Sequence, residues 1–126
     1  MEIEFLYVFL YLILAHWVAD FVFQDEYWAL NKKNSLKALL SHTITYSLMV
    51  SLMFLWILSP MNLLIFWAIT FVTHTITDYF SSKIVGKKFE NKEMGSPIPN
   101  LGAFSVIGLD QVIHYITLFF TLYLLL

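Results

Sequence analysis

The sequence lacks cysteine altogether, which excludes disulfide bonds, thiolate metal sites and a cysteine nucleophile. It also lacks the Gly-x-Ser-x-Gly, phosphate-loop and dinucleotide-binding motifs of serine hydrolases and nucleotide enzymes. Charged residues are scarce, at 13% of 126 residues, whereas a soluble domain has about 25%. The seven basic residues form no dense patch, so we do not expect nucleic acid as a partner.

Hydrophobic residues are correspondingly abundant, at 60% of the chain, and the mean hydropathy is +0.74. Four apolar runs approach the roughly 20 residues that a helix needs to cross a bilayer. They lie near residues 3–23, 38–58, 61–81 and 104–126. The sequence therefore predicts an all-α integral membrane protein whose residues 1–126 form one transmembrane domain, a four-helix bundle. Glu2 and Glu4 stand where a signal peptide would be basic, so we expect the first span to stay in the mature protein.

The basic residues fall in two loops. They are Lys32, Lys33 and Lys37 between the first two runs, and Lys83, Lys87, Lys88 and Lys92 between the last two. The positive-inside rule then places both loops in the cytoplasm and both termini outside. We therefore expect a multi-pass protein of the cytoplasmic (inner) membrane, in contact with membrane lipids.

The connections between the runs differ in length. The link from Ser59 to Asn62 is short, so the second and third spans should form a tight antiparallel hairpin. A longer polar stretch follows the third span and contains Gly86, Gly95, Pro97, Pro99 and Gly102. These residues favour turns, so we expect a loop with at most a short surface helix.

Every histidine lies inside a predicted span, and three of the four lie one helical turn from an aspartate. The pairs are His16 with Asp20, His74 with Asp78, and Asp110 with His114; His42 is the fourth histidine. At about 1.5 Å rise per residue, all seven side chains fall about 5–15 Å from the cytoplasmic boundary. Ionisable groups rarely face lipid, so the seven should meet inside the bundle. No basic residue lies in a span, so we expect a metal ion, a proton or a histidinium to compensate the three carboxylates.

Imidazole and carboxylate together favour a divalent metal, with zinc first and iron or manganese next. Seven such groups exceed one tetrahedral site, so the prediction is one or two ions, about 3.5–4 Å apart if there are two. The predicted ligands are His16, Asp20, His42, His74, Asp78, Asp110 and His114. The three aspartates Asp20, Asp78 and Asp110 are also the candidate catalytic groups, as bridges or general base. Gln24 and Gln111 are candidates for binding an ion or a substrate oxygen.

Three functions fit this pattern. The first is metal-assisted hydrolysis of a lipid-like or phosphorylated substrate, in which the ion would activate a bound water. The second is transport of a metal ion or proton, which requires a polar path leading outward; the outer halves of three spans are mostly Leu, Phe, Ile and Val. The third is a structural or interaction protein in which His–Asp hydrogen bonds hold helices together, at about 0.6–2 kcal/mol each. Two copies could also pack as a homo-oligomer, although no Gly-x-x-x-Gly face specifies one.

Four stretches of the sequence carry a family resemblance. They are LAHWVADFVFQ, LLSHTITY, THTITDYFSSK and GLDQVIH. In this order they resemble the domain-of-unknown-function family 3307 of bacterial and phage membrane proteins, and the likeness covers nearly the whole chain. The resemblance marks His16, Asp20, Gln24, His42, His74, Asp78, Asp110, Gln111 and His114. The shorter THTITD stretch is also similar to small membrane proteins described as metal-dependent hydrolases.

Overall fold

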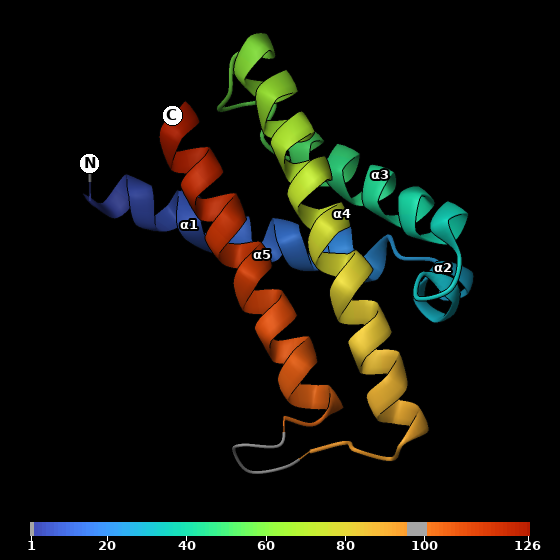
Figure 1. Ribbon diagram of the computed structural model, residues 1–126. Coiled ribbons are helices and arrows are strands. Elements are labelled where there is room, and N and C mark those ends of the chain that lie inside the picture. Colours follow the sequence, from blue (N-terminus) through green and yellow to red (C-terminus); the bar gives the residue numbers. More distant parts are fainter. Residues whose placement is uncertain (1, 96–100) are drawn as a thin grey trace.

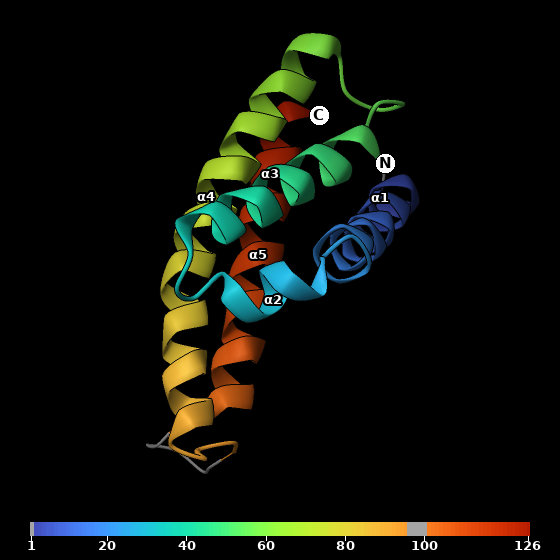
Figure 2. The ribbon, with the colours of Figure 1, turned by 90° about the vertical axis from the view of Figure 1, so that its right-hand side faces the viewer.

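The computed structural model describes residues 2–95 and 101–126, and within this part of the chain it is helical without strands, as predicted. The elements are α1 (Glu2–Trp17), the π-helical turn η1 (Val18–Val22), α2 (Glu26–Asn31), α3 (Leu36–Leu52), α4 (Pro60–Glu90) and α5 (Ala103–Leu125). Figure 1 shows α4 and α5 side by side as a long pair, with α1 crossing behind them. Figure 2 shows α3 lying against α4, and α2 connecting the end of η1 to the start of α3.

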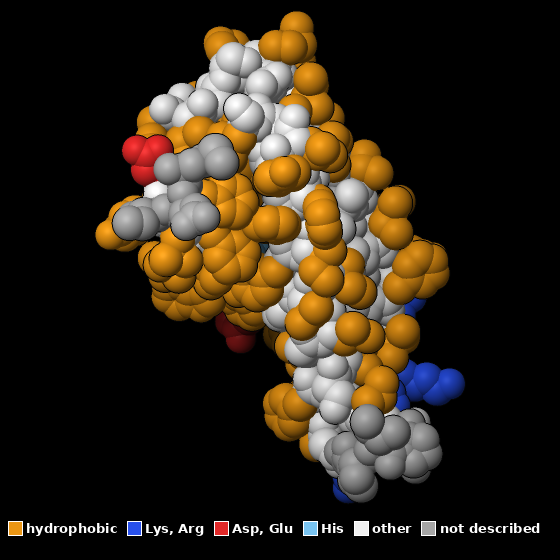
Figure 3. All heavy atoms as spheres, turned by 90° about the vertical axis from the view of Figure 1, so that its left-hand side faces the viewer, with side chains coloured by type: hydrophobic (Ala, Val, Ile, Leu, Met, Phe, Trp, Pro, Cys, Tyr) orange, Lys and Arg blue, Asp and Glu red, His pale blue; other side chains and the backbone are white. Residues whose placement is uncertain are grey.

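Three helical segments are long and apolar enough to cross a membrane: Glu4–Val22, Pro60–Glu90 and Ala103–Leu125. Helix α3, which covers the first part of the second predicted span, has 17 residues and measures about 25 Å. Many large apolar side chains face outward, among them Leu10, Ile69 and Phe120, and hydrophobic side chains cover much of the face in Figure 3. These lengths and this surface indicate association with a membrane.

The second predicted span ends earlier than expected, because α3 stops at Leu52 instead of continuing to residue 58. The chain leaves α3 through turns in which the Phe54 N–H donates to the carbonyl of Ser51. These turns direct the ring of Phe54 into the core, where it is fully buried with its centroid 5.5 Å from that of Phe66. Burial of such a side chain is worth about 1.5–3 kcal/mol, so packing rather than helix propensity sets this end.

The connections on either side of α4 follow from these boundaries. The link before α4 is longer than the predicted one because α3 ends early, although α3 and α4 still pack against each other. Ser59 caps α4 by accepting a hydrogen bond from the backbone N–H of Asn62, and Pro60 takes the first helical position. After α4, the predicted loop residues Pro97 and Pro99 lie outside the described residues.

Helix α4 also continues further than predicted, to Glu90 instead of residue 81. The expectation of a loop around Gly86 is therefore wrong. A single glycine costs a helix only about 1 kcal/mol, and no proline interrupts this part of the sequence. The Lys33 side chain lies directly against Gly86, where an added Cβ would come 2.6 Å from its Cδ. Gly86 thus leaves room for the Lys33 side chain, and α4 continues past this position without a break.

The hydrophobic core joins α1, α3, α4 and α5. Its fully buried members include Leu12, Val50, Phe54 and Phe66. One or two helical turns further along each helix, toward the lysine-bearing loops, the buried side chains become polar. The fold therefore stacks an apolar layer against a polar one, and the polar layer is the one nearer the loops.

Candidate metal centre

The structure brings all seven predicted histidines and aspartates together beside the apolar core, and we call them the His/Asp cluster. They come from α1 and η1 (His16, Asp20), α3 (His42), α4 (His74, Asp78) and α5 (Asp110, His114). Six of them are buried, and the side chain of Asp110 is 11% exposed. Five elements of the chain therefore contribute to one polar site.

Asp20, His42 and His74 place three ligand atoms at the corners of a small triangle. His42 Nε2 lies 3.1 Å from Asp20 Oδ1 and 3.2 Å from His74 Nε2, and His74 Nε2 lies 3.5 Å from Asp20 Oδ1. Ligands about 2.0–2.1 Å from a tetrahedral zinc ion stand about 3.3 Å from one another. The three edges of the triangle therefore match the ligand spacing around a single tetrahedral ion.

Protons alone satisfy this triangle poorly. A hydrogen bond between the two imidazole nitrogens uses a single proton, so one of the nitrogens must present a lone pair. The same His42 nitrogen also faces Asp20 Oδ1 and Asp78 Oδ2, at 3.1 and 3.3 Å, and ionised carboxylates only accept hydrogen bonds. A cation at the centre would accept a lone pair from each corner at once.

A second group of ligand atoms comes from His74, Asp78 and His114. His114 Nε2 lies 3.1 Å from Asp78 Oδ1 and 3.2 Å from Asp110 Oδ2. His74 belongs to both groups, and its ring stacks on that of His114 with 4.1 Å between the centroids. The cluster therefore offers two overlapping ligand sets with one shared histidine.

His16 belongs to the cluster but to neither of these two ligand groups. Its Nδ1 lies 2.8 Å from the Tyr46 hydroxyl, and its Nε2 lies 2.8 Å from Gln111 Oε1. Gln111 Nε2 in turn donates hydrogen bonds to Asp20 Oδ2 and Asp110 Oδ2, at 3.3 and 3.1 Å. Gln111 thus orients the carboxylate of Asp20 through its second oxygen, as hydrogen-bond partners of metal ligands commonly do.

Asp20 lies in η1, a π-helical turn in a segment that the sequence predicts as a regular helix. A π-helical turn inserts one residue into a helix, and such turns are rare and occur frequently at functional sites. Asp20 directs its Oδ1 toward His42 and His74, while its Oδ2 remains 3.7 Å from His16 Nε2. The carboxylate therefore contacts two other helices instead of only the histidine one turn away.

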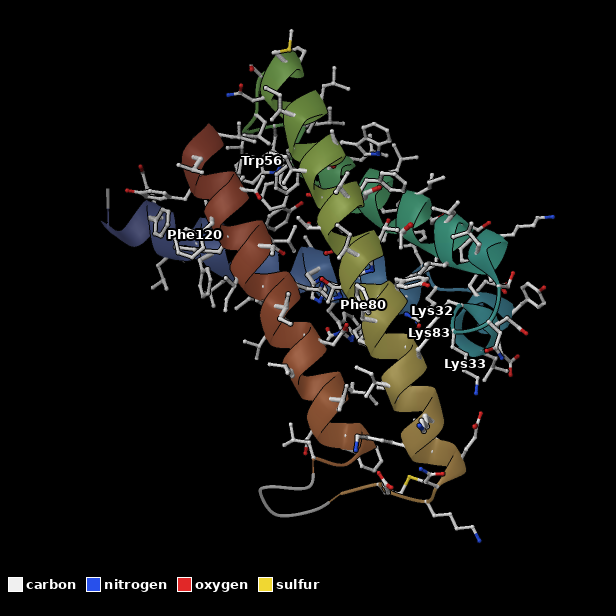
Figure 4. All side chains as sticks on the ribbon, in the orientation of Figure 1. Lys32, Lys33, Trp56, Phe80, Lys83 and Phe120 are labelled. Carbon is white, nitrogen blue, oxygen red and sulfur yellow. The ribbon has the colours of Figure 1, made fainter. Side chains whose placement is uncertain are left out.

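A lysine also compensates one of the carboxylates, which the absence of basic residues from the predicted spans did not lead us to expect. Lys32 Nζ donates a hydrogen bond of 2.6 Å to Asp78 Oδ2, and the lysine side chain is 18% exposed. Lys32 follows α2, whose first turn is capped by Asp25 through the backbone N–H of Tyr27. This short helix folds the loop back, so that Lys32 and Lys33 lie beside α4 (Figure 4). A lysine stem is long enough to carry its charge from a loop to a buried carboxylate.

A cavity of about 300 Å³ adjoins the cluster on the side of the loops. Its lining is polar at Asp20, Gln24, Lys32, Lys33, Ser81, Ser82, Asp110 and Gln111, and apolar at Phe21, Leu30, Val85, Phe89 and Ile107. Three buried polar atoms of this lining have no hydrogen-bond partner within the described part of the chain: Gln24 Oε1, Ser82 Oγ and Asp110 Oδ1. Unpaired buried atoms around a cavity are consistent with a bound ligand or water. Gln24 thus lies in the cavity wall.

The chain belongs to the DUF3307 family of proteins of unknown function, which it matches over residues 8–126. The resemblance drawn from the sequence is thereby confirmed, and the matched region contains the whole His/Asp cluster. No curated protein and no solved structure matches the chain. Because the family is one of unknown function, the activity has to be argued from the site itself.

Proposed function

We propose that this member of the DUF3307 family is a membrane-embedded metal protein that uses a divalent ion in the His/Asp cluster to hydrolyse a lipid-like or phosphorylated substrate. The observation that carries the proposal is the spacing of Asp20, His42 and His74, whose ligand atoms lie 3.1–3.5 Å apart. Nitrogen and oxygen ligands without sulfur suit zinc, with iron or manganese as alternatives.

The membrane arrangement that we propose is one transmembrane domain, residues 1–126, in the cytoplasmic (inner) membrane. Three segments have the length and apolarity to span it. Helix α3 is shorter but contacts both η1 and α4, so it would cross among the others. With the lysine-bearing loops in the cytoplasm and both termini outside, the cluster and its cavity would face the cytoplasmic leaflet.

A divalent ion bound at this site would supply a nucleophilic water at neutral pH and polarise the bond to be cleaved. The chain itself supplies the ligands Asp20, His42 and His74, and Gln111 fixes the second oxygen of Asp20. Asp110 lines the cavity with a buried Oδ1 that has no hydrogen-bond partner within the described residues. We assign this oxygen as the general base, because it can accept a proton from a water in the cavity.

The cavity lining supports a particular class of substrate. Lys32 and Lys33 bring positive charge to one part of the wall, whereas Phe21, Leu30 and Phe89 form an apolar part. A phosphorylated amphiphile would place its anionic group near the lysines and its hydrocarbon along the apolar side chains. This division favours a lipid-like, phosphorylated substrate over a small hydrophilic one.

Metal analysis of the purified protein tests the proposal. The protein would be isolated in detergent, with an affinity tag free of histidine and without chelator, and its metal content measured by mass spectrometry. We expect a stoichiometric divalent transition metal in the wild type and its loss in His74→Ala. Thr70→Val, nearly isosteric and buried on the same face of α4, is the matched control and should keep the metal. A wild-type preparation without any transition metal would reject the proposal.

An ion or proton transporter is the second candidate, because buried hydroxyls continue outward from the cluster. Ser51 Oγ and Thr70 Oγ1 are buried and have no hydrogen-bond partner within the described residues. Phe54, in the turns after α3, and Phe66, one turn from Thr70 on α4, are fully buried and pack against each other. This aromatic pair would obstruct a path for ions or protons outward from the cluster, which favours a closed site over a transport path. Proton or metal flux into liposomes that His74→Ala abolishes would favour transport over hydrolysis.

A structural or interaction role is the third candidate, since the contacts of the cluster already join α3, α4, α5 and η1. In this case the polar groups would hold the helices together without chemistry. Replacing Asp20, Asp78 and Asp110 together by alanine should then leave the activity of the protein in the cell intact. Loss of that activity in a variant that still folds would exclude the structural role.

A further inference from the structure

We infer that the cluster holds one divalent ion rather than two, and that the ammonium group of Lys32 takes the place of the second cation. This inference rests on the proposed metal function and deepens it. Lys32, a residue of the first loop, then determines how many ions the membrane-embedded site binds.

The two ligand groups compete for one nitrogen atom. His74 Nε2 lies 3.5 Å from Asp20 Oδ1 in the first group and 3.6 Å from Asp78 Oδ1 in the second. A neutral imidazole nitrogen offers one lone pair, so it serves one ion. The contact of His74 with Asp78 is made through Nε2, whereas the other nitrogen of the ring, Nδ1, is buried and has no hydrogen-bond partner among the described residues. Two ions would leave one of them short of a ligand.

Lys32 occupies the oxygen that Asp78 would need in order to bridge two ions. Its Nζ lies 2.6 Å from Asp78 Oδ2. A carboxylate that bridges two ions offers one oxygen to each, and the other oxygen of Asp78, Oδ1, already faces His74 and His114. Asp78 could bridge two ions only if the lysine withdrew.

His114 belongs to the second ligand group, which holds no ion in this arrangement. Its Nε2 lies 3.1 Å from Asp78 Oδ1 and 3.2 Å from Asp110 Oδ2. Ionised carboxylates only accept hydrogen bonds, so a nitrogen that contacts two of them and, unlike that of His42, no second imidazole nitrogen is stabilised as an N–H donor. A nitrogen that carries a proton has no lone pair for a metal. His114 therefore links two carboxylates instead of binding an ion.

The charges of the cluster agree with one ion. Its three carboxylates carry −3, whereas one divalent ion and the Lys32 ammonium carry +2 and +1, so the sum is zero. Two divalent ions beside the same lysine would leave +2 in a largely buried site. Uncompensated charge away from water is costly, so the structure favours the arrangement with a single ion at Asp20, His42 and His74.

Equilibrium dialysis of the metal-free protein against Zn²⁺ tests the inference. Full-length wild type, Lys32→Met and Lys33→Met would be dialysed in detergent, and bound zinc counted by mass spectrometry. We expect one equivalent in the wild type and in Lys33→Met, and two in Lys32→Met, where Oδ2 of Asp78 loses its ammonium partner and becomes free to bind the second. Lys33 is the matched control because it pairs with Glu90, at 3.2 Å, outside the cluster.

The outcomes separate this inference from the proposed function. Two equivalents in the wild type would overturn the inference and leave a metal protein, whereas no bound zinc in the wild type would reject the proposed function itself. One equivalent in Lys32→Met, bound as tightly as in the wild type, would show that the lysine does not replace an ion. Should Lys32→Met fail to fold, Lys32→Arg, which keeps the charge, must bind one equivalent, and two would contradict the inference.

Discussion

His42 Nε2 and His74 Nε2 lie 3.2 Å apart, although 32 positions separate the two residues in the sequence. They meet because α3 and α4 pack together and each turns its buried histidine toward the other. Asp20 completes the contact from η1 with its Oδ1 3.1 and 3.5 Å from the two nitrogens. The ligand group of Asp20, His42 and His74 therefore forms between helices and contains none of the His–Asp pairs seen in the sequence.

The two kinds of histidine in the cluster should differ in their effect on metal binding. His42→Ala removes a ligand and should abolish zinc binding. His16→Ala removes a hydrogen-bond partner of Gln111 and should weaken zinc binding by about 10–100-fold. Competition with a chromophoric chelator measures both affinities. Equal losses in the two variants would contradict the assignment of His16 to a supporting role.

Asp110→Asn should separate chemistry from metal binding. Asp110 lines the cavity, and the variant keeps the shape of its side chain but loses the carboxylate that we assign as the general base. We expect bound zinc to stay at the wild-type level while kcat falls about 10²–10⁴-fold. The measurement is phosphate release from a phosphorylated amphiphile in mixed micelles, with metal content determined on the same samples. Parallel loss of zinc and activity would instead make Asp110 a ligand.

Gln111→Leu should destabilise the protein and loosen the site. The amide contacts His16, Asp20 and Asp110, and unpaired buried partners cost about 1–3 kcal/mol. We expect a lower unfolding temperature in detergent and about tenfold weaker zinc binding. Gln24→Leu is the control, since Gln24 Oε1 has no hydrogen-bond partner within the described residues. Equal destabilisation by both variants would argue against a special role of Gln111.

Phe54→Ala should reduce stability without changing the number of ions bound. The side chain is fully buried against Phe66, and truncation of a buried phenylalanine costs about 3–5 kcal/mol. Phe120→Ala, at a side chain that is 58% exposed, should change stability by less than about 1 kcal/mol. Thermal unfolding in detergent and zinc counting provide the two readouts. A change in zinc stoichiometry in Phe54→Ala would show that the apolar layer and the site are coupled.

The proposed orientation can be tested with single cysteines, because the chain contains none of its own. Glu93→Cys lies in the exposed loop after α4, and Met61→Cys lies at an exposed position in its first turn. A membrane-impermeant maleimide added to intact cells should label only Met61→Cys. In inside-out vesicles the same reagent should label only Glu93→Cys. Labelling of both from the same side would contradict the orientation.

The members of the cluster were predictable because the chain cannot leave ionisable groups in contact with lipid. On α4, for example, Thr70, His74 and Asp78 recur every fourth residue, which defines one helical face, and all three are buried. The same reasoning placed His114 on the inner face of α5, where it is also buried. Spacing along a helix thus identifies which side chains meet when each helix has one polar face.

The remaining features depend on contacts between distant parts of the chain. Lys32 meets Asp78 across 46 positions, and nothing in the local sequence of the first loop specifies that partner. The end of α3 is set by the packing of Phe54 on Phe66, although the residues after Leu52 are apolar enough to continue a helix. The periodicity of a sequence predicts which face of a helix is buried, but it does not predict which other segment of the chain packs against that face.

Helix α4 has 31 residues and measures about 46 Å, whereas the hydrocarbon layer of a bilayer is about 30 Å thick. In the proposed orientation its final turns project beyond that layer and carry Val85 and Phe89 of the cavity wall into the headgroup region. A lipid could then present its head to the ion by lateral diffusion within one leaflet, while its acyl chains stay immersed. Such an enzyme would need no step that extracts its substrate from the membrane.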